Sequence, residues 1–336
     1  MRAMVLNSLA TLDENPEPLT LVDVPRPVPA AGEVLIRISA CGVCHTEIDE
    51  IEGRTPPPTL PVIPGHEVVG TVEISGGDVV SLKPGDRVGV GWIHSSDGTP
   101  SENLSPAFRA TGRDVNGGYA EFMVVGERYA YPITDEFTDV EAAPLLCAGG
   151  VGYRALKLTG LNNGERLGLT GFGGSGHLVL QLARHLYPDG EVYVFARSQR
   201  ERKFALELGA DWAGDTSESP PEPPDAIIDT TPAWTPVLAA LAVLRPGGRL
   251  VINAIRKEER DKRVFAEIDY ARHLWLEKEI KSVANVTSAD LREFLAIACE
   301  IPLKPEVQTF RLEDANAAIR ALKDGHLRGT KVLKII

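Results

Sequence analysis

Gly171-Phe172-Gly173-Gly174-Ser175-Gly176 fits the pattern G-x-G-x-x-G and lies between an apolar run, 167–170, and a helical run that reaches Leu186. With 32 glycines in the chain an isolated match is weak, but this strand–turn–helix context is typical of dinucleotide-binding units. Glycines permit the tight turn and the close approach of a pyrophosphate, and the helix N-terminus offers free N–H groups. We therefore expect the turn to bind dinucleotide phosphates through Gly171, Gly173, Gly174, Ser175 and Gly176. The alternative is a tight turn without a ligand.

Outward from this turn, the chain changes pattern near residue 150. Downstream, expected strands alternate with helices, which predicts a doubly wound parallel sheet. These strands are 191–195, 226–229, 249–252 and 279–283. Upstream, short apolar runs bounded by Gly or Pro, such as 33–38 and 68–74, predict a small antiparallel barrel or sandwich. The stretches 94–118 and 215–224 are expected to be loops. An amphipathic helix over 314–323 precedes a final strand, 331–335, which has no partner in the parallel sheet and is expected to return to the first domain.

Composition excludes several classes of protein. The 336 residues carry 35 Lys and Arg against 47 Asp and Glu, and this net charge of −12 argues against nucleic acid or an anionic membrane as partner. A hydrophobic content of 43% excludes overall disorder, and no run is long and apolar enough for a membrane span. The N-terminus predicts a first strand rather than a secretory signal. Four cysteines are too few for a disulfide framework, which favours a cytoplasmic location.

The end of the second strand of the parallel sheet predicts which coenzyme is preferred. An NAD site usually has Asp or Glu there to bind the ribose 2′-hydroxyl, but this chain has Ala196. Arg197, Ser198 and Arg202 follow and could bind a 2′-phosphate through charge-assisted hydrogen bonds. We expect NADP(H) to be favoured over NAD(H). The alternative is that these basic residues only begin a helix and face the solvent.

The cysteines suggest a metal site. Cys41 and Cys44 form a C-x-x-C run, His66 and Glu67 follow, and Cys147 is distant. A catalytic zinc needs only three protein ligands, which separate segments can supply. On spacing alone, a redox motif and a buried Cys147 that fills the core stay open.

Several motifs together resemble the zinc-dependent alcohol dehydrogenases of the medium-chain dehydrogenase/reductase superfamily. They are Cys41–Glu47, Pro64–Glu67, Lys83–Val88, Gly117–Glu121, Cys147–Tyr153, the glycine-rich turn and Leu208–Asp211. They occur in family order over nearly the whole chain. The resemblance implies a GroES-like β-rich catalytic domain formed by residues 1–147 and 287–336, with a Rossmann dinucleotide-binding domain, 148–286, inserted.

The resemblance also implies a site. The zinc ligands would be Cys44, His66 and Cys147, while Cys41 would be a small buried residue. Glu67 matches a carboxylate that approaches the metal during ligand exchange. Glu47 takes the place of an acid, usually Asp, that orients the histidine.

Three more positions carry expectations from the family. Thr46 matches the hydroxyl that passes the substrate proton outward. Asp49 stands where many relatives continue the proton relay with histidine, so it is either a proton acceptor or merely exposed. Trp92 matches a bulky residue lining the substrate pocket, whereas His94 is expected to lie in a loop.

Relatives often bind a second, structural zinc through four cysteines in the segment that corresponds to 94–118. This chain has no cysteine there, and Ser105 stands where the last ligand would be. We therefore expect one zinc per chain. The resemblance further implies a homodimer or homotetramer.

Together these features predict an enzyme that transfers hydride between an alcohol or carbonyl substrate and a nicotinamide coenzyme. Two alternatives are a zinc-free enone or quinone reductase of the same superfamily and a non-enzymatic nucleotide-binding relative. The first normally lacks the set Cys44, His66 and Cys147, and the second would be marked by the loss of a metal ligand, whereas this chain keeps all three. The identity of the substrate does not follow from the sequence.

Overall fold

Two units make up the chain in the computed structural model, which describes residues 1–301, 303–325 and 329–335. The first unit comprises Met1–Cys147, Val286–Cys299 and Lys304–Ile336, and the second comprises Ala148–Asn285 and Glu300–Leu303. Each unit has its own main sheet.

The second unit is built on a six-stranded parallel sheet in the order β12-β11-β10-β13-β14-β15. The strands are β10 (Arg166–Thr170), β11 (Glu191–Phe195), β12 (Trp212–Gly214), β13 (Ala226–Asp229), β14 (Arg249–Ile252) and β15 (Glu279–Ser282). The helices are α3 (Ala148–Thr159), α4 (Gly174–Leu186), α5 (Gln199–Glu207), α6 (Thr235–Val243), α7 (Tyr270–His273) and the 3₁₀ helix η4 (Lys262–Glu267). This is the strand order of a dinucleotide-binding fold, whose order reverses between β10 and β13. Ligands of such sheets bind outside the carboxyl ends of the strands at that point.

Burial explains why these segments form strands and helices. The central strands β11 and β13 are almost fully buried, as continuous apolar runs in a parallel sheet require. Gly168 in β10 leaves room for Ile227, because a Cβ at Gly168 would lie 2.8 Å from the Ile227 side chain. Helix α4 buries Leu178, Val179 and Leu182 at helical spacing. The expected doubly wound parallel sheet is thus confirmed.

The first unit contains a seven-stranded sheet in the order β16-β17-β3-β4-β5-β9, with β8 also paired to β3. Its strands are β3 (Glu33–Val43), β4 (Val68–Ser75), β5 (Arg87–Val90), β8 (Phe122–Gly126), β9 (Ala130–Pro132), β16 (Val307–Arg311) and β17 (Thr330–Lys334). Two further pairs are β1 (Arg2–Leu6) with β2 (Leu19–Asp23) and β6 (Ile93–Ser95) with β7 (Arg109–Ala110). The helices are α1 (His45–Ile51), α2 (Asp139–Ala142), α8 (Ser288–Glu300, all but its last residue in this unit), α9 (Ala315–Lys323) and the 3₁₀ helices η1 (Glu102–Leu104), η2 (Glu127–Tyr129), η3 (Ala143–Leu146) and η5 (Leu312–Asp314).

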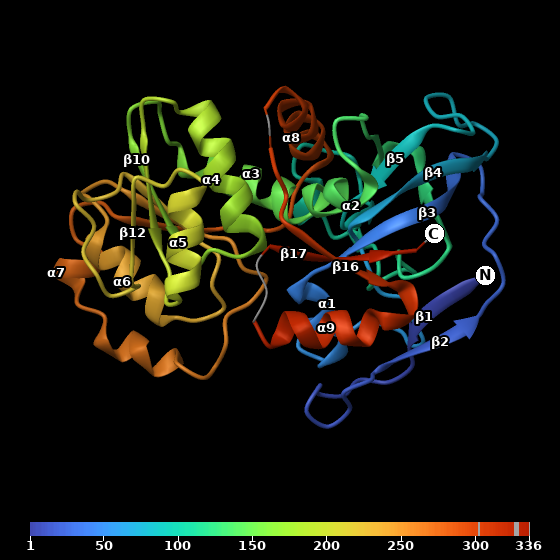
Figure 1. Cartoon of the computed structure of the whole chain (residues 1–336), viewed down its shortest axis with the longest axis horizontal. Coiled ribbons are helices and arrows are strands. Elements are labelled where there is room, and N and C mark those ends of the chain that lie inside the picture. The colour runs from blue at the N-terminus through green and yellow to red at the C-terminus, as the bar shows by residue number, and fades with distance from the viewer. Residues whose placement is uncertain (302, 326–328, 336) are drawn as a thin grey trace. The chain divides into compact units, whose positions relative to one another are not determined.

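The C-terminal strand returns to the first unit. Strand β17 pairs antiparallel with β3, with Leu333 opposite Cys41, and the two lie side by side in Figure 1. Helix α9 packs beneath it through Ala315, Ala318, Ile319 and Leu322, the apolar face of an amphipathic helix. The expected return of the final strand is therefore confirmed.

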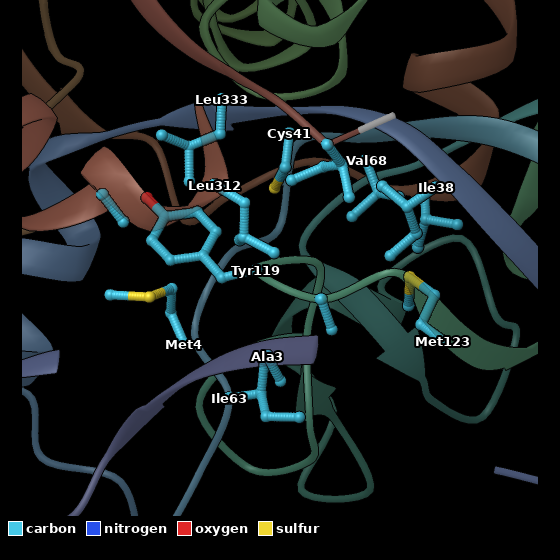
Figure 2. Packing of buried hydrophobic residues seen from close by; sticks show 14 of the residues in the cluster. Ala3, Met4, Ile38, Cys41, Ile63, Val68, Tyr119, Met123, Leu312 and Leu333 are labelled. Atoms are coloured by element: carbon cyan, nitrogen blue, oxygen red, sulfur yellow. The ribbon is translucent and has the colours of Figure 1, made fainter. Parts of the chain in front are cut away.

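A large cluster of buried apolar residues lies in the first unit. Figure 2 shows Cys41, Tyr119 and Leu333 pointing into it, with Met4 beside Tyr119. The Cys41 side chain is fully buried and lies so close to Gly65 and Gly118 that a Cβ on either would come within 2.9 Å of its sulfur. Cys41 is a core residue, as expected.

The segment 94–118 differs from the loop that the sequence predicts. His94 lies in β6, and its Nε2 is 3.3 Å from the carbonyl of Val124. Buried Glu102 binds two other segments: it accepts a 2.6 Å bond from the backbone N–H of Ser288 and a 3.0 Å bond from the Tyr129 hydroxyl. Composition could not reveal these bonds, because their partners lie up to 186 residues away. No helix among the described residues is long and apolar enough to cross a membrane.

Candidate active site

Four side chains in the first unit bring potential metal ligands together. One ligand atom from each of Cys44, His66, Glu67 and Cys147 lies within 4.8 Å of the others. His66 is fully buried, yet no described residue forms a hydrogen bond with its Nε2 or with Oε2 of buried Glu67. Buried polar atoms without partners are costly, and two sulfurs, one nitrogen and one carboxylate are ligands that zinc accepts. The donor set therefore fits a zinc ion.

Three backbone features position these residues. Cys44 is the N-cap of α1, directly after β3, and Cys147 directly follows η3. His66 and Glu67 directly precede β4 and follow Gly65, which has a φ of +97°. A Cβ at Gly65 would lie 2.4 Å from Tyr119, so both the conformation and the space require glycine.

The Glu47 carboxylate touches two of the potential ligand residues. Its Oε1 lies 2.6 Å from Nδ1 of His66, and its Oε2 accepts a 2.8 Å hydrogen bond from the backbone N–H of Cys44. Both Glu47 and His66 are buried. Because Glu47 is the third residue of α1, its side chain, which is longer than that of an aspartate, reaches back to the N-cap as in a capping box. The contact at Nδ1 leaves Nε2 of His66 as the atom available to a metal.

Proton affinities in the cluster are strongly perturbed. A hydrogen bond from Cys147, only partly offset by burial, holds the pKa of Cys44 well below its usual range. The same hydrogen bond, together with burial, holds the pKa of Cys147 well above the usual range of a thiol. Burial opposes protonation of His66, but the Glu47 carboxylate raises the pKa of His66 well above its usual range. Burial raises the pKa of Glu67. A thiolate at Cys44 is the form that binds metal.

Thr46 and Asp49 both lie on α1, near the cluster. Thr46 is buried, and its hydroxyl oxygen lies 3.6 Å from the Cys44 sulfur, which is within the distance of a hydrogen bond that involves sulfur. Asp49 is also buried, and its Oδ1 accepts a 2.6 Å bond from Nε of Arg54. The expectation that Asp49 could be merely exposed is wrong, because Arg54 compensates its charge within the fold.

Trp92 lies beside the cluster. Its ring centroid is 5.8 Å from that of His66 and 5.9 Å from that of Phe108, which packs edge-on. The Trp92 indole N–H is buried and has no hydrogen-bond partner in the described part of the chain. The sequence does not point to Phe108, because the segment 94–118 shows no regular spacing of apolar residues.

In the second unit, the glycine-rich turn joins β10 to α4. Gly171 has a φ of +80°, and a Cβ at Gly176 would lie 2.8 Å from the Gly171 carbonyl, so the turn itself requires these two glycines. A Cβ at Gly173 would meet no described residue within 4 Å. Gly173 is exposed and is the N-cap of α4, and Gly174 and Ser175 begin the helix. The open space at Gly173 is where an approaching phosphate would need a residue without a side chain.

The predicted 2′-phosphate residues follow β11. Ala196 is buried, whereas Arg197 and Ser198 are exposed. Ser198 caps α5 by accepting a bond from the N–H of Glu201. The Arg202 guanidinium turns back to the carbonyls of Ala196, at 2.7 Å, and Arg197, at 3.0 Å. Arg202 therefore holds this turn together, whereas Arg197 stays exposed.

Comparisons with known proteins identify the family. Two family models match the chain: an alcohol dehydrogenase GroES-like domain over residues 30–135, and a zinc-binding dehydrogenase over residues 174–299. The probable alcohol dehydrogenase AdhA of Mycobacterium tuberculosis (strain CDC 1551 / Oshkosh) is 40% identical over 347 residues, covering 100% of this chain and 97% of that protein. The chain belongs to the zinc-type alcohol dehydrogenases of the medium-chain dehydrogenase/reductase superfamily.

Further members of this alcohol dehydrogenase family match over almost the full length. An alcohol dehydrogenase of Geobacillus stearothermophilus is 35% identical, covering 97% of this chain and 98% of that protein. The solved structure of a cobalt- and zinc-bound thermostable alcohol dehydrogenase from Pyrobaculum aerophilum is 25% identical, with a TM-score of 0.86, and 99% of each chain is covered. The expected family and fold class, and the expectation that the chain is an enzyme, are confirmed.

Proposed function

We propose that this alcohol dehydrogenase is zinc-dependent and interconverts a small alcohol with the corresponding aldehyde or ketone, using NADP(H) in preference to NAD(H). The observation that carries the proposal is the convergence of Cys44, His66, Glu67 and Cys147 within 4.8 Å, with Glu47 against His66. A zinc-free reductase would have no need of this buried donor set.

Cys44, His66 and Cys147 would hold the zinc, with Glu67 close enough to replace one ligand during exchange. Bound zinc supplies Lewis-acid polarisation of the substrate oxygen, and a bound nicotinamide supplies the hydride carrier. Thr46 Oγ1 would accept the substrate hydroxyl proton and donate one in the reverse direction. Asp49, three residues further on α1, shares a face with Thr46 and could take that proton onward. Trp92 would line the substrate pocket.

The coenzyme would lie at the carboxyl edge of the parallel sheet. Gly173, Gly174 and Ser175 at the start of α4 would bind its phosphates through backbone N–H groups. Beyond β11, buried Ala196 offers no acceptor for a ribose 2′-hydroxyl, whereas exposed Arg197 and Ser198 offer donors to a 2′-phosphate. Arg202 would act by holding the turn that carries them.

We further propose one zinc per chain, because the segment 94–118 has no cysteine and is instead anchored through Glu102. All four cysteines are unbridged, which supports the reducing cytoplasm as the location. The family resemblance supports a homodimer or homotetramer.

The test compares two cysteines of one motif. Cys44→Ala should lose zinc and alcohol oxidation while keeping the fold, whereas Cys41→Ala, in the core, should keep zinc and lose stability. Zinc content, circular dichroism and turnover on a panel of alcohols and aldehydes with NADP(H) and NAD(H) check both variants. Near-normal turnover of Cys44→Ala would contradict the mechanism, and a strong NAD(H) preference of the wild type would contradict the coenzyme assignment.

A further inference from the structure

A buried ion pair in the second unit joins the end of β13, which also binds the end of β10, to the segment that follows β14. The Lys257 ammonium, beyond β14, binds Oδ2 of Asp229, the last residue of β13. The other oxygen of Asp229, Oδ1, accepts a 2.5 Å bond from the hydroxyl of Thr170, the last residue of β10. Asp229 is fully buried, and the Lys257 side chain is only 7% exposed. These strands end where the strand order of the sheet reverses, the place at which such sheets bind ligands.

The pair also fixes the loop that follows β13. Besides the carboxylate, Lys257 Nζ donates to the carbonyls of Thr231, at 2.7 Å, and Ala233, at 3.0 Å. An ammonium has three donors, so these three acceptors occupy it fully. Thr231 Oγ1 in turn donates a 2.7 Å bond to Asp229. Lys257 therefore has no donor left for a ligand, and its contacts are all within the fold.

The loop held in this way packs against the glycine-rich turn. A Cβ at Gly171 would lie 2.8 Å from Oγ1 of Thr230 and 3.0 Å from Cγ2 of Thr231. Thr230 Oγ1 donates a 3.0 Å bond to the carbonyl of Thr170, the residue before the turn. Any shift of the loop would thus be transmitted to Gly171, which starts the phosphate-binding turn.

We propose that Lys257 is a positioning residue for the coenzyme: paired with Asp229, it holds the loop 230–234 against the glycine-rich turn and so preorganises that turn for dinucleotide binding. This inference rests on the proposed nicotinamide coenzyme site. Preorganised sites bind more tightly because less ordering is required on binding. Removal of the Lys257 charge leaves the Asp229 carboxylate buried without its cation, and the loop must rearrange to hydrate it.

The experiment measures dissociation constants of NADPH and NADH by nicotinamide fluorescence, along with kcat, KM and Tm. Lys257→Met should weaken coenzyme binding by about fivefold or more, with a smaller change in kcat at saturating coenzyme. The double variant Asp229→Asn with Lys257→Met should recover part of the affinity, because no unpaired charge remains. Lys262→Met is the matched control, since Lys262 belongs to the neighbouring segment but pairs with Glu259 at the surface, and it should behave as wild type.

Thr231→Val provides a milder variant if Lys257→Met does not fold. It removes one bond to Asp229 at nearly constant volume and should raise the coenzyme dissociation constant by a smaller factor. A fall in Tm with unchanged coenzyme affinity in either variant would show that the pair is only structural and overturn the inference. Absence of coenzyme binding by the wild type would instead overturn the proposed function.

Discussion

Oε1 of Glu47 lies 2.6 Å from Nδ1 of His66, and the same carboxylate accepts a hydrogen bond from the backbone of Cys44. One buried side chain therefore orients two potential zinc ligands that are 22 positions apart in the chain. Partners of this kind fix the ring orientation and basicity of a ligating histidine.

Glu47→Gln is predicted to weaken zinc binding by roughly 10- to 100-fold, because a neutral amide no longer stabilises the charge distribution at His66. Glu47→Asp keeps the charge and should have a smaller effect. Competition with a chromogenic chelator measures the dissociation constant. Glu127→Gln serves as the control, because the carboxylate of Glu127 accepts a hydrogen bond from Ser81 and touches no potential zinc ligand. Wild-type affinity in Glu47→Gln would refute the orienting role.

Gly42→Ala is predicted to displace Glu67. A Cβ at Gly42 would lie 1.8 Å from Oε2 and 2.8 Å from Cβ of Glu67, so the carboxylate must move. Overpacking of this kind costs about 1–3 kcal/mol of the free energy of unfolding. The loss should be smaller in the background Glu67→Ala, which removes the closest atoms. Urea unfolding of the four proteins in this cycle measures the coupling.

The control for Gly42→Ala is Gly126→Ala, because Gly126 has an ordinary φ of −60° and a Cβ there would have no atom of the described residues within 4 Å. This variant should unfold like the wild type. Equal losses of stability for Gly42→Ala with and without Glu67 would mean that the two residues are not coupled.

Arg197→Ala is predicted to weaken NADP(H) binding by about tenfold or more, as expected for the loss of a hydrogen bond to a charged group, and to leave NAD(H) binding nearly unchanged. The ratio of kcat/KM for the two coenzymes measures the effect. Lys203→Ala, which removes an exposed cation from the same region, should leave this ratio unaltered. A parallel loss for both coenzymes would assign Arg197 to general binding rather than to selection.

The architecture could be predicted from the sequence, because its signals are local. Each signal comes from a few neighbouring residues: the alternating apolar runs, the turn Gly171–Gly176, and the final strand 331–335, which has no helix linking it to the parallel sheet. The parallel sheet of the second unit and the return of β17 to the first unit follow the prediction for this reason, whereas its pairing with β3 is seen only in the structure.

Contacts between polar side chains could not be predicted in this way. Asp49 pairs with Arg54, Arg202 turns to the backbone, and Lys257 reaches Asp229. Hydropathy patterns do not encode these choices, because each depends on which partner the tertiary fold brings within bonding distance. The roles assigned to Thr46, Asp49, Glu67 and the zinc ligands stay predictions until they are measured.

The most direct test is to remove zinc from the wild-type protein with a chelator and to titrate zinc back while following alcohol-dependent coenzyme reduction. Activity should be absent in the metal-free protein, rise in proportion to added zinc, and reach its plateau at one zinc per chain. The metal-free Cys44→Ala variant should stay inactive at every zinc concentration. Full activity of the metal-free protein, or a plateau only at two zincs per chain, would contradict the account.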